Sequence, residues 1–435
     1  MSLPPEMDAL PEDCCSLGQT IDYYQALESL GEPTCDEVLR ALRDVTADDE
    51  IARRFETEPG FRISLIRFSE PARIYHFRPQ RLHRDRPTPV PLQIRFEASL
   101  PGFSDADEDR HEIAFDLHPE PGSVGRLAAL VGKNGTGKTQ LLARLATALS
   151  RNPQVEKEHH LEFSGPPVGR VIAVSYNALD TFATSPHDFV AIDNREARPA
   201  MDSYRYCGLR DREGSLNPEL IFYRLGVDMA EITALERVEM WKRMVDETRV
   251  AENEPHLQAA LESGDVDSMV EATRRLGAGQ KMAITVLTRV LASIRNGAVV
   301  TIDEPEVNLH PSLLAALLRV LHGWLDHFDG YGIIATHSPI GLQEIPGRNV
   351  RVLRRVGPVP LIQPYPSESF GQGLSEIVAE VFGVDEQDKN YVTVLRDLLA
   401  SGASPEQIEV SFGRPLTLNA RMALRALARE GASRA

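Results

Sequence analysis

Apolar residues near the start of the chain recur every three or four positions, which is the spacing of a helix. One such run covers residues 23–30, and a second covers residues 38–45 after a break at Gly31-Glu32-Pro33. Both runs predict short helices that bury one face. We therefore expect residues 1–60 to form a small helical accessory region.

The spacing changes between residues 61 and 115, where apolar and polar residues alternate in short runs. Residues 63–68, 92–96 and 113–115 show this alternation, and a period of two predicts strands. Pro-rich and acidic segments between the runs predict loops. A strand-rich N-terminal lobe is the resulting prediction.

Longer apolar runs then alternate with helical patterns through the rest of the chain. Strands are predicted at residues 127–131, 170–176, 298–302 and 332–336, and helices at residues 141–146, 218–275, 312–324 and in the tail from 391. Strands that alternate with helices predict an α/β fold with a mainly parallel, doubly wound sheet. The predicted domains are 1–60, helical; 61–215, strand-rich lobe; 216–275, helical subdomain; 276–385, second lobe; and 386–435, helical tail.

Composition narrows the class of protein. The chain has 435 residues, 42% of them hydrophobic, and a formal net charge of −17. This charge argues against a surface that binds nucleic acid all over. The four cysteines have no metal-ligand spacing and predict free thiols. No apolar run approaches the roughly 20 residues of a membrane span, and no signal peptide pattern is present, so we expect a soluble, cytoplasmic protein with no membrane partner.

One glycine-rich segment fits the P-loop pattern G-x-x-x-x-G-K-[ST] without a mismatch. It consists of Gly132, Lys133, Asn134, Gly135, Thr136, Gly137, Lys138 and Thr139. An apolar strand precedes it and a helix follows, which is the context that the motif requires. Backbone N–H groups of such a loop surround a phosphate, the lysine reaches the β- and γ-phosphates, and the threonine hydroxyl holds Mg²⁺. The segment predicts binding of a nucleoside triphosphate.

A second motif supplies carboxylates. The strand at residues 298–302 ends in Asp303-Glu304-Pro305-Glu306, which is the Walker B arrangement. Asp303 is predicted to hold Mg²⁺, and Glu304 is predicted to polarise the water that attacks the γ-phosphate.

With these two motifs the chain resembles the ABC-type ATPases, in particular their soluble branch with the SMC and RecF-like proteins. A third feature, the segment Leu276-Gly277-Ala278-Gly279-Gln280, resembles the signature motif Leu-Ser-x-Gly-Gln, with Gly277 in place of the serine. The resemblance implies a P-loop NTPase fold of the ABC-ATPase type, binding of ATP with Mg²⁺, and hydrolysis. It also implies that Leu276, Gly277, Gly279 and Gln280 contact nucleotide bound to a second subunit of a homodimer or higher homo-oligomer.

The fourth feature is His337, which follows the strand at residues 332–336 and matches the switch histidine of these ATPases. Their Q-loop glutamine has no counterpart, and Asn177 is the predicted substitute. The segment Asn308-Leu309-His310-Pro311 resembles ATPases related to the OLD family and the ATPase subunits of anti-phage systems (PtuA of Septu, AriA of PARIS). This likeness implies control of a separate effector, a nuclease or toxin-like protein, in bacterial anti-phage defence.

Two alternatives stay open. The first is a RecF- or SMC-like repair or recombination ATPase that binds nucleic acid directly. Its predicted footprint is basic, with two interleaved aromatic residues: Arg73, Tyr75, His76, Phe77, Arg78, Arg81, His83, Arg84 and Arg86. Such a surface would contact phosphates and stack bases. The second alternative is a scaffold in which ATP holds an assembly together without hydrolysis.

Overall fold

The computed structural model describes most of the chain and divides it into two compact units, residues 1–372 and 373–435. The described residues are 8–19, 21–58, 60–66, 71, 74–75, 91–100, 110–119, 124–150, 160–166, 168–177, 180–184, 204–211, 215–217, 219–356, 359–383 and 390–434. All statements below concern these residues.

The central element of the first unit is a sheet in which seven described strands run in the order β10-β9-β3-β8-β7-β5-β6. The strands are β3 (Leu127–Gly132), β5 (Val171–Ser175), β6 (Tyr204–Gly208), β7 (Val299–Asp303), β8 (Tyr331–Thr336), β9 (Val350–Val356) and β10 (Val359–Pro364). Only β9 and β10 pair antiparallel. Every residue of β3, β5, β7 and β8 is buried, because helices or a second sheet cover both faces of a parallel sheet. The predicted parallel core is confirmed.

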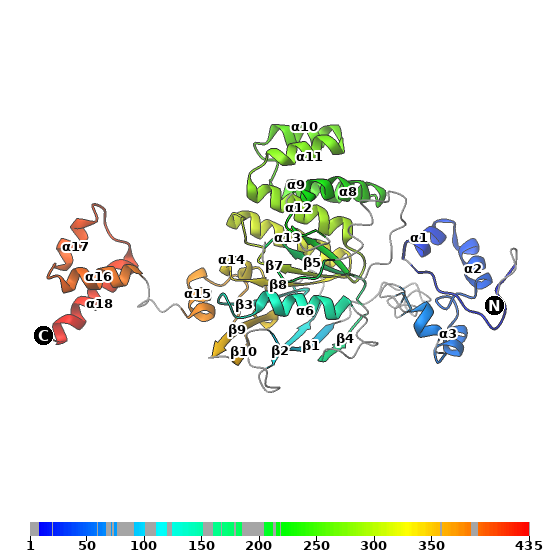
Figure 1. The fold of residues 1–435 in the computed structure, drawn as a ribbon, viewed down its shortest axis with the longest axis horizontal. Helices are drawn as coiled ribbons and strands as arrows, with labels where there is room; N and C mark the ends of the chain where they lie inside the picture. The colour runs from blue at the N-terminus through cyan, green and yellow to red at the C-terminus, as the bar shows by residue number, and fades with distance from the viewer. Residues whose placement is uncertain are drawn as a thin grey trace. The chain divides into compact units, whose positions relative to one another are not determined.

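A smaller antiparallel sheet lies on one side, in the order β2-β1-β4. It contains β1 (Leu92–Ala98), β2 (His111–Leu117) and β4 (His160–Ser164). Buried and exposed residues alternate along β1 and β2, as expected of strands with one face in the core. Helix α6 (Lys138–Ser150) packs against both sheets (Figure 1), and its apolar residues join the two in one core.

Helices α12 (Ala278–Ser293) and α13 (Pro311–His327) cover the other face of the large sheet (Figure 1). Above α12 stands a helical subdomain of α8 (Leu220–Ala234), α9 (Val238–Thr248), α10 (Pro255–Ser263) and α11 (Val266–Arg275). A buried ion pair of 2.6 Å between Asp228 of α8 and Arg289 of α12 links the subdomain to the core. Two short helices, α14 (Pro339–Gln343) and η3 (Gly347–Asn349), lie between β8 and β9. None of the helices in the described part of the chain is long and apolar enough to cross a membrane.

The N-terminal residues form their own small helical cluster with α1 (Ile21–Ser29), α2 (Glu32–Ala41) and α3 (Asp49–Phe55). Buried Asp44 accepts hydrogen bonds from the Tyr24 hydroxyl at 2.9 Å and from the Thr46 backbone N–H at 2.8 Å. These bonds satisfy a carboxylate that burial would otherwise make costly.

The strand predicted at residues 63–68 is wrong over its described part, because Phe61–Leu65 forms a short π-helix, and residues 67 and 68 lie outside the described residues. Phe61 is buried and packs edge-on against Tyr75, with the ring centroids 5.0 Å apart. Packing of Phe61 and Leu65 into the helical cluster outweighs the local preference for a strand, which depends strongly on its surroundings.

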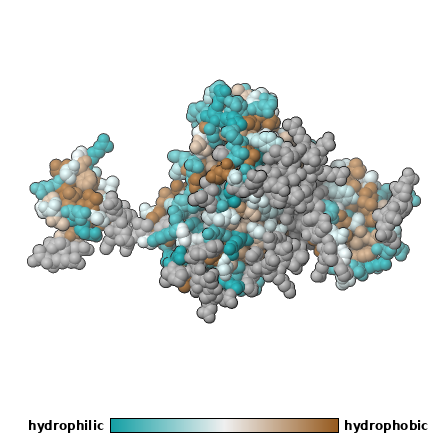
Figure 2. Space-filling model, viewed as in Figure 1, coloured by the Kyte–Doolittle hydropathy of each residue, from teal (hydrophilic) through white to brown (hydrophobic). Residues whose placement is uncertain are grey.

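The second unit contains α15 (Leu374–Phe382), α16 (Asn390–Ala400), α17 (Pro405–Ser411) and α18 (Leu418–Arg434). Leu395, Ile408 and Leu424 form a small core between the last three helices, so the helical tail is confirmed. The unit also exposes large apolar side chains, among them Val410 and Met422. Hydrophobic residues are prominent on its visible face in Figure 2.

Candidate functional site

The P-loop connects β3 to α6, as the motif predicts. A Cβ atom on Gly132 would lie 2.2 Å from the backbone oxygen of Leu353, so no other residue fits there. Gly135 and Gly137 have φ angles of 78° and 92°, which side chains rarely tolerate. These glycines let the backbone turn tightly, while Lys133, Asn134 and Gly135 form its exposed tip.

Lys138, the first residue of α6, is folded back onto its own loop. Its Nζ donates to the carbonyl oxygens of Gly132 at 2.9 Å and Lys133 at 3.1 Å. Burial lowers the pKa of Lys138, while the charges of Glu304, Asp303 and Glu306 act in the opposite direction. The ammonium group therefore lies within electrostatic range of the carboxylates at the end of β7 and just after it.

Thr139 and Asp303 meet directly, although 164 residues separate them in the sequence. The Thr139 hydroxyl donates to Asp303 Oδ1 at 3.0 Å. The other oxygen, Oδ2, is buried and has no hydrogen-bond partner among the described residues. Burial raises the pKa of Asp303 to about 7, helped by Glu304 and Asp180 and opposed by Thr139 and Lys138.

This pair fits a magnesium ion. A buried carboxylate oxygen without a partner needs a positive charge, and a hydroxyl and a carboxylate are both oxygen ligands, which Mg²⁺ prefers. The described residues contain no cluster of three or more His, Cys, Asp and Glu side chains that would hold a metal alone. Mg²⁺ bound through one carboxylate, one hydroxyl, phosphate and water needs no such cluster.

Glu304 and His337 lie at the ends of neighbouring parallel strands. Asp303, the last residue of β7, pairs with Ala335 of β8, and the Glu304 N–H donates to the Ala335 carbonyl at 2.8 Å. Glu304 has a left-handed φ of 48°, an uncommon conformation that often marks functional sites. Its Oε1 is 3.8 Å from His337 Nδ1, and the His337 side chain is 42% exposed.

Glu306 follows the Walker B pair, where its sequence position predicts no role, and the structure places it against His337. Glu306 Oε1 accepts from the His337 backbone N–H at 2.7 Å and lies 3.0 Å from His337 Nδ1. Its Oε2 accepts from the Thr336 hydroxyl at 2.8 Å. Glu306 and His337 are 31 residues apart in the sequence and meet only in the folded chain. No sequence pattern could have indicated this contact.

The signature-like segment begins α12. Leu276 is buried, whereas Gly277 at the N-cap is exposed. Gln280 Oε1 accepts from the Gly277 N–H at 3.1 Å, and its amide nitrogen donates to Val250 and Glu254. The first backbone N–H groups of a helix have no acceptor within the helix, so this exposed helix start is chemically suited to an anion.

The lack of a side chain at Gly279 lets this helix start lie close to the segment after β7. A Cβ atom at Gly279 would lie only 2.5 Å from the Asn308 carbonyl oxygen. Asn308 has a φ of 64°, and His310 beyond it accepts from the Ser312 N–H as the N-cap of α13. The signature-like segment and the turn after Walker B therefore pack backbone to backbone.

The loop after β5 contains Asn177 and, three residues on, the carboxylate of Asp180, which belongs to no sequence motif. The Asp180 N–H donates to the Asn177 carbonyl at 3.2 Å. Asp180 is buried, accepts from the Tyr206 hydroxyl at 2.8 Å and pairs with Arg210. Its charge raises the pKa of Asp303, so Asp180 belongs to the electrostatic surroundings of the site.

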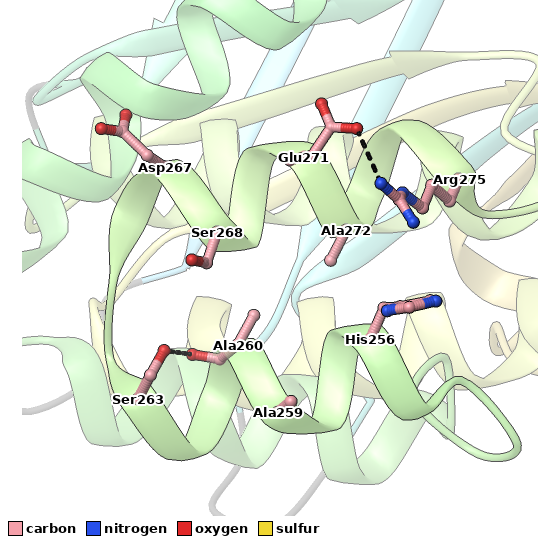
Figure 3. Close-up of a pocket in the computed structure, with 9 residues that line it drawn as sticks. All are labelled: His256, Ala259, Ala260, Ser263, Asp267, Ser268, Glu271, Ala272 and Arg275. Atoms are coloured by element: carbon pink, nitrogen blue, oxygen red, sulfur yellow. Dashed lines mark hydrogen bonds and ion pairs between the residues drawn. The ribbon is translucent and has the colours of Figure 1, made fainter.

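Two other regions are candidates for ligand binding. A groove of about 570 Å³ lies between α10 and α11 and contains none of the predicted site residues (Figure 3). Three alanines line it, and Glu271 is paired with Arg275 at 3.4 Å. The other region is the predicted nucleic-acid footprint. Tyr75 is buried there and unavailable for stacking, and the remaining footprint residues lie outside the described part of the chain.

These features define the class of protein. A P-loop on β3, a Walker B carboxylate on β7, a histidine after β8 and a flanking antiparallel sheet make up an α/β P-loop NTPase fold of the ABC-ATPase type. The predicted fold class is confirmed.

Comparison with known proteins gives distant likenesses. No protein-family model matches the chain. Protein ea59 of Escherichia phage lambda is 29% identical over 456 residues, covering 96% of this chain and 83% of ea59. The phosphonates import ATP-binding protein PhnC of Burkholderia pseudomallei is 24% identical over 229 residues, covering 52% of this chain and 62% of PhnC.

Two solved structures complete the comparison. A chain of a putative metal-chelate type ABC transporter in an inward-facing conformation is 16% identical, with a TM-score of 0.34 over 68% of this chain and 90% of that one. The cbiO1 protein of Clostridium perfringens, part of the ABC transporter complex cbiONQ, is 14% identical, with a TM-score of 0.32 over 71% of this chain and 94% of cbiO1.

Proposed function

We propose that the protein is a Mg²⁺-dependent ATPase that dimerises around nucleotide and controls a separate effector. The observation that carries the ATPase proposal is the contact between Thr139 and Asp303, with a buried carboxylate oxygen beside it that lacks a partner. ATP is favoured among the nucleotides because PhnC, a relative over half of the chain, is described as an ATP-binding protein.

The P-loop residues bind the phosphates. Asn134, Gly135, Thr136 and Gly137 present backbone N–H groups around the β-phosphate. Lys138 exchanges the carbonyl oxygens that it now contacts for phosphate oxygens. Buried as it is, its charge acts in a medium that screens it less than water does.

Thr139 and Asp303 hold Mg²⁺, which neutralises charge on the phosphates when bound. Glu304 orients the attacking water and accepts its proton. His337 follows the neighbouring strand β8, where its Nδ1 lies 3.8 Å from Glu304. It contacts the γ-phosphate or the water. Asn177 is assigned a supporting role in the same hydration shell.

The hydrolysis proposal is tested by phosphate release from ATP with Mg²⁺. We expect Glu304→Gln to lose at least 100-fold in kcat while it still binds ATP, because an amide cannot accept the proton. Glu239→Gln on the exposed surface of α9 is the matched control and keeps full activity. Equal rates for Glu304→Gln and the wild type would refute the assignment.

The dimer proposal rests on the exposed helix start at Gly277 and Ala278, whose backbone amides can bind an anion. The segment also lies between the P-loop and Walker B in the sequence, where the signature motif of ABC-type ATPases lies. Leu276, Gly277, Gly279 and Gln280 then contact nucleotide on the partner subunit. Sedimentation of Glu304→Gln tests this, and the expected result is a mass increase on addition of ATP that Lys138→Ala does not show. A mass independent of ATP in both variants contradicts ATP-dependent assembly.

Control of a nuclease or toxin-like effector in anti-phage defence is the finer part of the proposal. It is supported by the resemblance of the segment Asn308-Leu309-His310-Pro311 to defence ATPases. Mass spectrometry of proteins that co-purify with wild type and Glu304→Gln, expressed with the neighbouring genes, tests it. A stoichiometric partner supports the proposal, whereas recovery of the chain alone or with nucleic acid favours a self-contained repair ATPase.

A further inference from the structure

Glu306 contacts the segment around the switch histidine through both oxygens of its carboxylate. Nucleotide binding requires none of these contacts. The two oxygens accept from the backbone N–H of His337 and from the hydroxyl of Thr336. The same Thr336 oxygen accepts from the Ser338 N–H at 2.9 Å. The Glu306 side chain is only 11% exposed, so these contacts lie largely out of water.

The histidine ring completes the arrangement. Nδ1 of His337 is buried and has no hydrogen-bond partner within the described residues, but the carboxylate oxygen Oε1 of Glu306 lies 3.0 Å from it. An ionised carboxylate can only accept hydrogen bonds. An unprotonated Nδ1 carries partial negative charge and would be repelled by a carboxylate oxygen 3.0 Å away, so the charge of Glu306 favours a proton on Nδ1.

We propose that Glu306 is a positioning residue, which fixes the ring of His337 and keeps its proton on Nδ1. Nε2 then becomes the ring atom that faces the nucleotide or the attacking water. The group beside one ring nitrogen determines which nitrogen carries the proton and so what the other nitrogen does, as carboxylates do for metal-bound histidines. The catalytic consequence rests on the proposed ATPase function, whereas the position of the proton does not.

Glu304 and Glu306 thereby have separate tasks. Both carboxylates approach the same nitrogen, Glu306 at 3.0 Å and Glu304 at 3.8 Å. Because Glu306 holds Nδ1, Glu304 remains available to a water molecule. Glu306 therefore adds a third carboxylate to the Walker B segment. This carboxylate contacts the end of β8 and His337 rather than the metal.

The first experiment determines the protonated ring nitrogen without any hydrolysis. Long-range ¹H–¹⁵N spectra of protein labelled at its 12 histidines distinguish a protonated ring nitrogen from a bare one, and His337→Gln identifies the signal. We expect protonated Nδ1 in the wild type and in Glu306→Gln, which retains an acceptor oxygen. In Glu306→Ala the proton should move to Nε2. A wild-type ring with a bare Nδ1 overturns the proposal.

The second experiment separates positioning from folding. Glu306→Ala should lower kcat roughly 10- to 100-fold with the KM for ATP within about twofold, because the P-loop rather than His337 makes most of the proposed phosphate contacts. Glu306→Gln should restore most of kcat. Loss of kcat in both variants to the same extent, or a rise in KM alone, argues for a different role. If the wild type hydrolyses no ATP, the proposed function fails while the spectra still decide where the proton resides.

Discussion

Asp303 provides a test of the metal site that needs no turnover, because its buried carboxylate should destabilise the protein when no ion is bound. Replacing it by asparagine keeps the shape of the side chain and an oxygen that can accept from Thr139. The substitution removes the charge and the ability to ionise. We expect Asp303→Asn to be more stable than the wild type at neutral pH in the presence of a chelator.

The magnitude follows from the pKa. Burial raises the pKa of Asp303 from 3.8 to about 7, so the folded protein holds this proton more tightly than the unfolded chain does. The wild type therefore loses stability progressively as pH rises from 3.8 through about 7, and the full loss applies above pH 7. At about 1.36 kcal/mol per pKa unit, the loss amounts to a few kcal/mol, with about 4 kcal/mol as the upper figure.

Melting temperatures measured between pH 4 and pH 8 check this reasoning. The difference between Asp303→Asn and wild type should be small at pH 4 and grow to several degrees at pH 8, at roughly 2 °C per kcal/mol for a unit of this size. Asp246→Asn on the exposed surface of α9 is the control and should show no such trend. With Mg²⁺ and ATP the order should reverse, because only the wild type binds the ion and ligand binding stabilises the folded state.

The refuting result is a constant difference across this pH range, or a wild type that is the more stable protein at pH 8 with chelator. Either outcome would mean that Asp303 carries its charge at no cost in the apo protein. The physical argument for a metal at the partnerless oxygen would then be lost.

Three further predictions concern glycine substitutions, two of them in the signature-like segment. Gly279→Ala should destabilise the protein by about 1–3 kcal/mol, because its Cβ would lie 2.5 Å from the Asn308 carbonyl oxygen. Gly323→Ala in α13, where a Cβ meets nothing within 4 Å, should stabilise the protein by about 0.5–1 kcal/mol. In thermal unfolding, the two variants should shift the melting temperature in opposite directions. Gly277→Ser should be tolerated, since φ −63° and ψ 158° suit serine, and should stabilise by a few tenths of a kcal/mol as an N-cap. In sedimentation it should dimerise at lower ATP concentrations than wild type, and an unchanged or higher ATP requirement would count against the signature assignment.

Elements of the fold could be predicted where a short segment of the sequence contains the whole pattern, and could not where distant contacts decide the structure. The strands β3, β5, β7 and β8 are continuous apolar runs, and their burial on both faces leaves that pattern in the sequence. Strand β10 contains no buried residue and four of its six residues are exposed. It was not predicted, and β4, β6 and β9 were not predicted either. The segment at residues 63–68 has the composition of a strand, yet contacts with the helical cluster made Phe61–Leu65 a helix.

The candidate site divides in the same way. The sequence by itself determined the P-loop, because eight consecutive residues contain its glycines, its lysine and its threonine, and a turn around a phosphate is a local conformation. Only the tertiary structure decided which side chains meet: Thr139 with Asp303, and Glu306 with His337. Those contacts depend on the order β3-β8-β7, which is set by packing of the connecting helices on the two faces of the sheet. Because strand order is a property of the whole core, no short segment of the chain contains it.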